Sequence, residues 1–152
     1  MRKILPQDTI NGKEGRAYVK INGDNEELFF ARSVSAQIDY TKSEIKAIGR
    51  RMAGHKVMGA SGTGSMTLYY LSPIFRRMAM SYVKTGVGFT FDLVVENEDP
   101  SSAAGRQVTL LTGCSLNSVV LAKLDGDSED ALDEECEFTF DDAEILTHFT
   151  QF

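Results

Sequence analysis

Alternation of apolar and polar residues predicts that most of this chain forms β-strands. From 87 to 96, Phe89, Phe91, Leu93 and Val95 fall on one side, and the other side is mainly polar. That pattern is typical of a strand with one buried and one wet face. Seven strands are predicted in all, over residues 16–21, 27–40, 65–71, 87–96, 107–112, 115–124 and 131–142.

One helix is predicted between Pro73 and Gly86. Ser72 suits the N-cap, Pro73 the first helical position and Gly86 a left-handed C-terminal residue. Apolar residues recur between them at helical spacing: Ile74, Phe75, Met78, Ala79, Tyr82 and Val83. We therefore expect this helix to pack its apolar stripe on the sheet.

Two predicted strands carry a polar face that is unsuited to a core. In residues 27–40, one face holds Leu28, Phe30, Val34, Ile38 and Tyr40, whereas the other becomes small and polar after Phe29 and Ala31. In residues 131–142, acidic side chains alternate with apolar ones. Like charges on one face of a strand repel each other, so this face is expected to meet water.

The connection 43–65, SEIKAIGRRMAGHKVMGASGTGS, is too long for an ordinary loop between two predicted strands. Connections beyond about 12–15 residues are usually functional or disordered. Spaced apolar residues and repeated glycines favour a shaped segment that reaches out of the domain to touch a partner.

Charge is unevenly distributed along the chain. Residues 125–144 hold eleven acidic and no basic side chains, so the rest of the chain sums to +5 and the total is −6. Residues 42–56 hold five Lys or Arg against Glu44. Two oppositely charged surfaces favour a head-to-tail contact that propagates as a ring or filament. Two ordinary solvated faces are the alternative.

Length and composition predict one domain without a catalytic, metal or cofactor site. The 152 residues show no signal peptide or apolar membrane-spanning run, and Cys114 and Cys136 are expected to be buried free thiols in a reducing compartment. The glycine run 59–65 lacks the lysine of a phosphate-binding loop, and the acidic run 125–130 lacks the glutamate that a calcium loop needs at Cys136. We therefore expect no enzyme activity. The basic segment has no aromatic residues for base stacking, which disfavours tight DNA binding.

The order KSEIKAIGRRMAGHK followed by GASGTG resembles the tail tube proteins of contractile-tailed bacteriophages, phage-like elements and phage tail-like bacteriocins. The segments NGKEGRAYV and SEDALDEECEFTFDD are similar to the same family, so the resemblance covers nearly the whole chain. It implies a mainly β fold, an antiparallel barrel or sandwich with one packed α-helix and a long extended loop at about 41–64, in a single domain over 1–152. It also implies hexameric rings that stack into the inner tube of a contractile tail, a conduit for DNA or ions.

The resemblance also implies partners. These are other copies in head-to-tail stacked rings, a sheath protein outside, a tape measure protein or DNA passing through the lumen without tight binding, and a baseplate or tail initiator. No membrane insertion is expected. Assembly would take place in the host bacterial cytoplasm, and the protein would afterwards reside in the tail of a virion or phage-like particle. Two alternatives are a ring-forming tube of a secretion or puncturing apparatus and a monomeric ligand-binding β-domain.

Two candidate sites follow. The ring-stacking contact is expected to use Lys42, Lys46, Arg50, Arg51, Met52, His55, Lys56, Val57 and Met58. The lumen is expected to be lined by Ser33, Ser35, Gln37, Asp39, Asp133, Glu135, Glu137 and Asp141. The outer surface is the rival placement for this second set.

Overall fold

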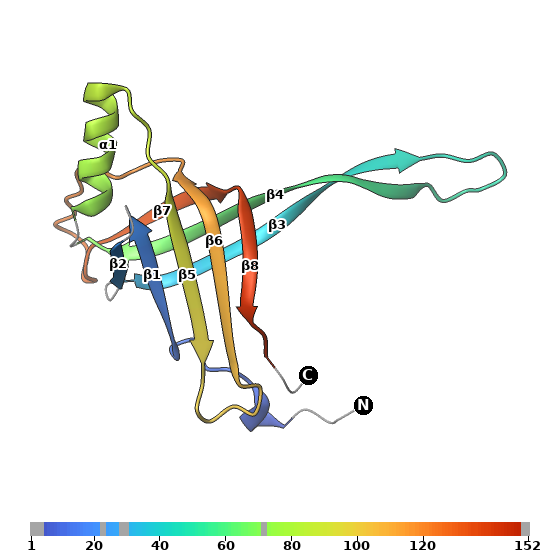
Figure 1. Ribbon diagram of the computed structural model, residues 1–152, viewed down its shortest axis with the longest axis horizontal. Coiled ribbons are helices and arrows are strands. Elements are labelled where there is room, and N and C mark those ends of the chain that lie inside the picture. Colours follow the sequence, from blue (N-terminus) through green and yellow to red (C-terminus); the bar gives the residue numbers. More distant parts are fainter. Residues whose placement is uncertain (1–4, 22–23, 28–30, 71–72, 150–152) are drawn as a thin grey trace.

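The computed structural model describes residues 5–21, 24–27, 31–70 and 73–149. It is mainly β, with one α-helix and a long projecting hairpin (Figure 1). The elements in chain order are a short 3-10 helix η1 (Pro6–Asp8), β1 (Gly15–Ile21), β2 (Asp24–Glu27), β3 (Ala31–Ile45), β4 (Gly54–Tyr69), α1 (Ile74–Thr85), β5 (Phe91–Glu98), β6 (Arg106–Leu116), β7 (Asp133–Phe140) and β8 (Asp142–Thr147).

The strands pair antiparallel in the order β2-β1-β5-β6-β7-β4-β3, with β8 also paired to β6. Strand β6 is the corner of this arrangement. Its first part pairs with β5 and β8, and its last residues, Ser115 and Leu116, pair with β7. Two residues before the pairing with β7 begins, Gly113 has a φ of 66°, a left-handed conformation that residues with a Cβ rarely adopt. This glycine lets one strand belong to both halves of the fold.

The core lies between these halves and takes residues from most strands. Fully buried side chains come from β1, β4, β5, β6 and β7: Val19, Met66, Leu68, Leu93, Leu111 and Phe138. Cys114 and Cys136 are buried free thiols, as predicted, and burial raises their pKa values to about 12 and about 11. Such thiols are poor nucleophiles near neutral pH.

The predicted helix is present, but only its first turn packs deeply. Phe75 is buried, with its ring 5.6 Å from that of Phe91. The helix ends where Gly86 adopts a φ of 75° and donates its backbone N–H to Tyr82 O. Tyr82 and Val83 are 53% and 73% exposed, so the expectation that the whole stripe packs on the sheet is wrong. Pro73 lies one position before the helix, and Ser72 lies outside the described residues.

Other differences concern strand limits. The strand expected at 115–124 is wrong, because β6 ends at Leu116 and the chain to residue 132 has no strand. Strand β8 was not predicted. Most of the expected strand 27–40 is β3, whereas Leu28, Phe29 and Phe30 lie outside the described residues.

Candidate assembly surfaces

A polar surface extends over β3, β4 and β7, and we call it the polar face. The strand register places Ser35 opposite Ser65, and Ser65 opposite Glu137. The adjacent rows are Ser33, Thr67 and Glu135 on one side and Gln37, Thr63 and Thr139 on the other. Residues directly opposite each other share a face, so three strands contribute to one continuous polar surface.

Hydrogen bonds between side chains of the polar face link β3 to β4 and also form within β3. Thr63 Oγ1 donates to Asp39 Oδ2 at 2.9 Å, and Gln37 Nε2 donates to Asp39 Oδ1 at 3.0 Å. The Ser35 and Ser65 hydroxyls are 3.3 Å apart. Glu135 and Glu137 are exposed. The face is therefore wet, with exposed carboxylates on β7.

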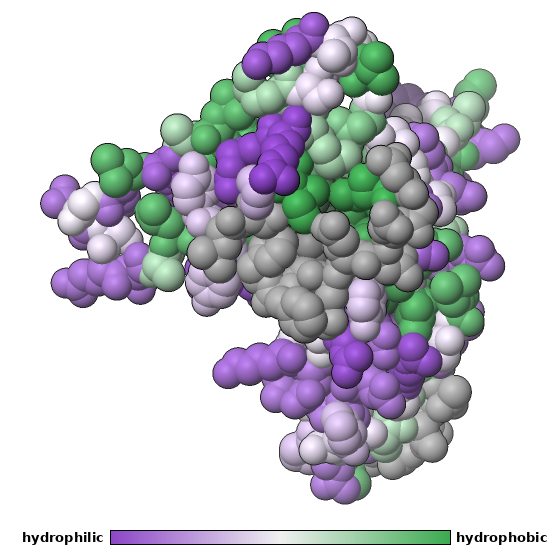
Figure 2. All heavy atoms as spheres, turned by 60° about the vertical axis from the view of Figure 1, so that its left-hand side comes forward, coloured by the Kyte–Doolittle hydropathy of each residue, from purple (hydrophilic) through white to green (hydrophobic). Residues whose placement is uncertain are grey.

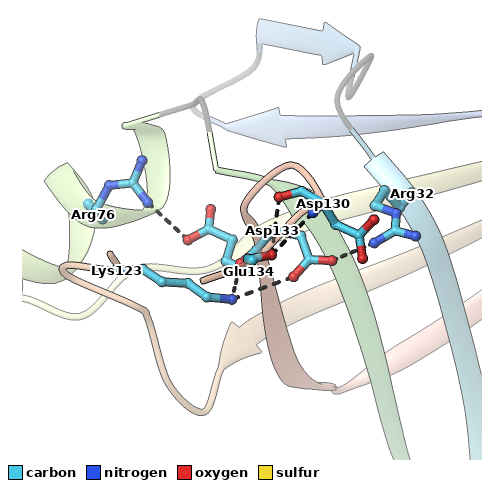
Figure 3. Close-up of polar contacts among 7 residues, drawn as sticks. Arg32, Arg76, Lys123, Asp130, Asp133 and Glu134 are labelled. Atoms are coloured by element: carbon cyan, nitrogen blue, oxygen red, sulfur yellow. Dashed lines mark hydrogen bonds and ion pairs between the residues drawn. The ribbon is translucent and has the colours of Figure 1, made fainter. Parts of the chain in front are cut away.

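The acidic end of the polar face has basic neighbours. Arg32 Nη1 donates to Asp133 Oδ2, and Lys123 Nζ donates to Asp133 O at 2.6 Å (Figure 3). Arg32 also lies 5.6 Å from the centre of the Tyr69 ring. These contacts connect the start of β3, the start of β7 and the segment after β6.

The structure brings most of the predicted lumen residues together. Ser33, Ser35, Gln37, Asp39, Asp133, Glu135 and Glu137 share the polar face. Asp141 lies past the end of β7, where its N–H donates to Thr112 O and its side chain lies beside Gly113. Asp141 therefore lies at the β6 corner and not on the polar face.

Two glycines of the run 59–65 serve packing on the opposite side of the sheet. Gly62 pairs with Phe140 and Gly64 with Phe138. A Cβ on either glycine would collide with the paired ring. Both lie inside β4, so the glycines admit aromatic rings of the core.

The long extended loop predicted at about 41–64 is a β-hairpin, and we call residues 41–64 the arm. Its strands pair out to Ile45 and Gly54, and residues 46–53 form the tip (Figure 1). The expectation of a long loop at 43–65 is therefore corrected. Along most of the arm both faces of the ribbon are exposed, so no apolar alternation marked these strands in the sequence.

Apolar and basic side chains are exposed together on the arm. Ile48, Met52 and Met58 are 107%, 77% and 64% exposed. The candidate stacking residues are likewise exposed: Lys42, Lys46, Arg50, Arg51, Met52, His55, Lys56, Val57 and Met58. Within the described ranges, none of the basic ones forms an ion pair. Ile45 and Ile48 belong to the same exposed apolar set, although the sequence reasoning did not place them in the site.

Four exposed acidic residues lie at the end of the molecule opposite the arm. The arm projects from one end, whereas α1 and the segment between β6 and β7 lie at the opposite end (Figure 1). In that segment Asp125, Asp127, Glu129 and Asp130 are all exposed, and we call residues 125–130 the acidic loop. Figure 2, which turns this end forward, shows apolar surface open to solvent beside strongly polar side chains. The basic arm and the acidic loop thus lie at opposite ends of the molecule (Figure 1), whereas the rest of the acidic segment 125–144 lies along β7 and β8.

A buried ion pair attaches α1 to the sheet, and the sequence reasoning did not single it out. Glu134 is 3% exposed, and its Oε2 accepts from Arg76 Nη1 at 2.9 Å (Figure 3). The Arg76 guanidinium lies 4.4 Å from the centre of the Tyr70 ring. Burial raises the pKa of Glu134, and the Arg76 charge opposes that shift. The signal in the sequence was a carboxylate at a position where β7 otherwise carries apolar residues.

The described residues offer little else chemically. No cluster of three or more His, Cys, Asp or Glu within them could hold a metal ion. None of the helices in the described part of the chain is long and apolar enough to cross a membrane.

Comparison with known proteins gives consistent relatives. A family model described as phage tail tube protein matches residues 3–147. The chain is 41% identical over 142 residues, 93% of each chain, to the phage-like element PBSX protein XkdM of Bacillus subtilis (strain 168). A chain in the PVC sheath/tube terminator of an extracellular contractile injection system is similar with a TM-score of 0.69 and 14% identity, covering 91% of this chain and 97% of that one. A chain of the PVC sheath-tube complex has a TM-score of 0.64 and 14% identity, covering 90% of each. At such identity the two structures show a shared fold.

Proposed function

Because this chain belongs to the phage tail tube family, we propose that it forms hexameric rings that stack head to tail into the inner tube of a contractile phage or phage-like tail. In this proposal the tube is a conduit for DNA or ions. The chain acts as a structural subunit in it and carries out no catalysis.

The polar face is the observation that carries the proposal. It is a wet surface of three strands on the side of the sheet opposite the rings of Phe138 and Phe140. A ring of such sheets, each with this side inward, surrounds a water-filled channel. Glu135 and Glu137 then give the wall negative charge, which lets a polyanion pass without sticking because Coulomb repulsion offsets phosphate contacts.

The arm supplies the contact between rings in this proposal. Fully exposed Ile48 and largely exposed Met52 are unfavourable in water, and burying such a side chain is worth about 1.5–3 kcal/mol. Contact with the adjacent ring covers them and pairs the basic side chains with acidic ones.

Partners follow from the position of the subunit in a tail. The similar injection-system chain occurs in a sheath-tube complex, which supports a sheath protein around the outside of this tube. The other proposed partners are a baseplate or tail initiator at one end of the tube and a tape measure protein or DNA in its lumen. Assembly takes place in the host bacterial cytoplasm, and the finished tail belongs to a virion or phage-like particle.

Light scattering coupled to size exclusion over a concentration series, with negative-stain microscopy of the same fractions, tests the proposal. Six-fold rings or hollow tubes are expected, either spontaneously or after addition of the cognate tail initiator. A chain that stays monomeric with the initiator present would contradict the proposal and favour a ligand-binding β-domain.

A further inference from the structure

An apolar groove lies at the end of the molecule opposite the arm. Its volume is about 540 Å³. It lies between α1, the residues that follow α1, and the chain that leaves β6. Its apolar lining includes Met80, Val83, Phe89, Leu116, Val119 and Leu121.

The groove lining is partly exposed in the isolated chain, whereas Phe89, Leu116 and Val119 also pack against the core. Val83 is 73% and Leu121 is 58% exposed. Two hydrogen bonds hold the segment that carries Leu121 against the end of β4 and the start of β7: Tyr70 Oη donates to Leu121 O at 3.3 Å, and Lys123 Nζ donates to Asp133 O. The groove is thus formed by anchored backbone, and its apolar surface lacks a cover within the described chain.

The acidic loop follows the groove lining closely along the chain. Asp125, its first residue, comes four residues after Leu121, so the Cα atoms of these two residues are at most about 14 Å apart. Asp125, Asp127, Glu129 and Asp130 give the loop four negative charges. A partner for this end should therefore combine apolar side chains with positive charge.

The arm of a second copy has this chemistry. From Lys46 to Lys56 it carries four basic and no acidic side chains, together with exposed Ile48 and Met52. The chain's own arm points away from the groove, at the other end of the long axis (Figure 1). A donor at one end and an acceptor at the other make a heterologous contact, which propagates.

We infer that the groove between α1 and residues 115–121, with the acidic loop beside it, receives the arm tip of a copy in the adjacent ring. The inference rests on the proposed stacking of rings and names its acceptor. Apolar tip residues fill the groove, and the basic residues meet the acidic loop.

Paired charge reversal tests the acceptor. Three variants are compared with the wild type: R50E/R51E in the arm, D127K/E129K in the acidic loop, and the combination of all four changes. Each double variant is expected to raise the protein concentration needed for stacking by about tenfold or more, because attraction becomes repulsion. The combined variant restores attraction with the signs exchanged, and its threshold is expected to return to within about threefold of the wild type.

The reversed residues are exposed, so thermal melting of each variant should match the wild type and serves as the folding control. A combined variant that stacks no better than the worse double variant overturns the inference. A D127K/E129K variant that stacks normally also overturns the inference. If that variant fails to bind the sheath protein, the groove binds the sheath instead of the arm. Either result leaves stacked rings of the wild type, and hence the proposed function, intact. A wild type that never stacks with its initiator overturns both.

Discussion

At the residue scale, Gly64 illustrates how one missing side chain sets the packing of two strands. A Cβ on Gly64 would collide with the Phe138 ring and would lie 2.7 Å from Ser35 O. We expect G64A to lower the free energy of unfolding by about 1–3 kcal/mol, because the core ring must move out of its position. Urea unfolding followed by circular dichroism measures this change.

Gly59 is the matched control on the same strand. It is exposed, and a Cβ there would have nothing within 4 Å. G59A is therefore expected to change stability by no more than about 0.5 kcal/mol. Equal losses for the two variants would show that the cost comes from β4 backbone preferences and not from the Phe138 ring.

The buried Glu134 gives a prediction about pH. Its pKa is raised by burial, so the folded state favours its protonated form, and that stabilisation is complete below the unfolded pKa of about 4.3 and lost as pH rises through the folded pKa. Wild type should therefore gain stability relative to E134Q as the pH is lowered from 7 toward 4.5. Chemical unfolding of both proteins across that range measures the difference.

Exposed Glu135 provides the comparison, because E135Q changes the same type of side chain on the neighbouring position. E135Q thus controls for the loss of one carboxylate from β7. If the ion pair with Arg76 outweighed burial, the wild type would instead lose stability relative to E134Q on acidification, which would contradict the prediction.

At the element scale, the arm shows what a fold can build without a core. Its strands are held by pairing between β3 and β4, and the apolar residues of its tip contribute no packing in the isolated chain. Replacing residues 46–53 with Asn-Gly should therefore leave the melting temperature nearly unchanged and allow rings, because a two-residue turn can close a hairpin. The same replacement should abolish stacking, since the exposed tip is lost.

Sedimentation velocity and negative-stain microscopy of the tip variant separate these outcomes. A matched control replaces Lys13 and Lys20, both exposed and outside the arm, with Glu. This control should stack like the wild type. If the tip variant formed long tubes, the arm tip would not be needed for stacking, and the prediction would be wrong.

Sequence patterns predicted elements well where one face is buried and the other wet. Strand β7 alternates between buried Cys136 and Phe138 and exposed Glu135 and Glu137, and its strand and both faces were predicted. The same rule explains the failures. All residues of β8 are exposed, so no alternation marked it. Val119 and Leu121, which suggested a strand after residue 116, line a groove instead of a strand face.

The candidate surfaces were predicted to different degrees. The polar face could be identified residue by residue because strand parity assigns faces, and only Asp141 departs, where the chain leaves β7 for the corner. The groove could not be identified, since it depends on α1 standing partly off the sheet. Helical periodicity shows which residues share a stripe but not how far along the helix the stripe is covered.

At the scale of the whole molecule, the orientation of the polar face would decide what the proposed tube can conduct. If β7 faces the lumen, E135K/E137K should change a repelling wall into an attractive one without altering stability, because both side chains are exposed. Tubes of this variant assembled with a fluorescent single-stranded oligonucleotide should retain it and protect it from nuclease. Wild-type tubes should not.

The control D142K/E144K makes the same charge change on β8, which pairs with β6 away from the polar face. If this strand lies outside the lumen, bound oligonucleotide there remains open to nuclease. Protection in E135K/E137K tubes alone thus places β7 inside, since charge attraction is equal in both variants and only enclosure differs. Protection by the β8 variant alone would indicate the opposite orientation of the subunit, with β8 toward the lumen and the polar face toward the sheath. The carboxylates of the polar face would then favour a basic partner.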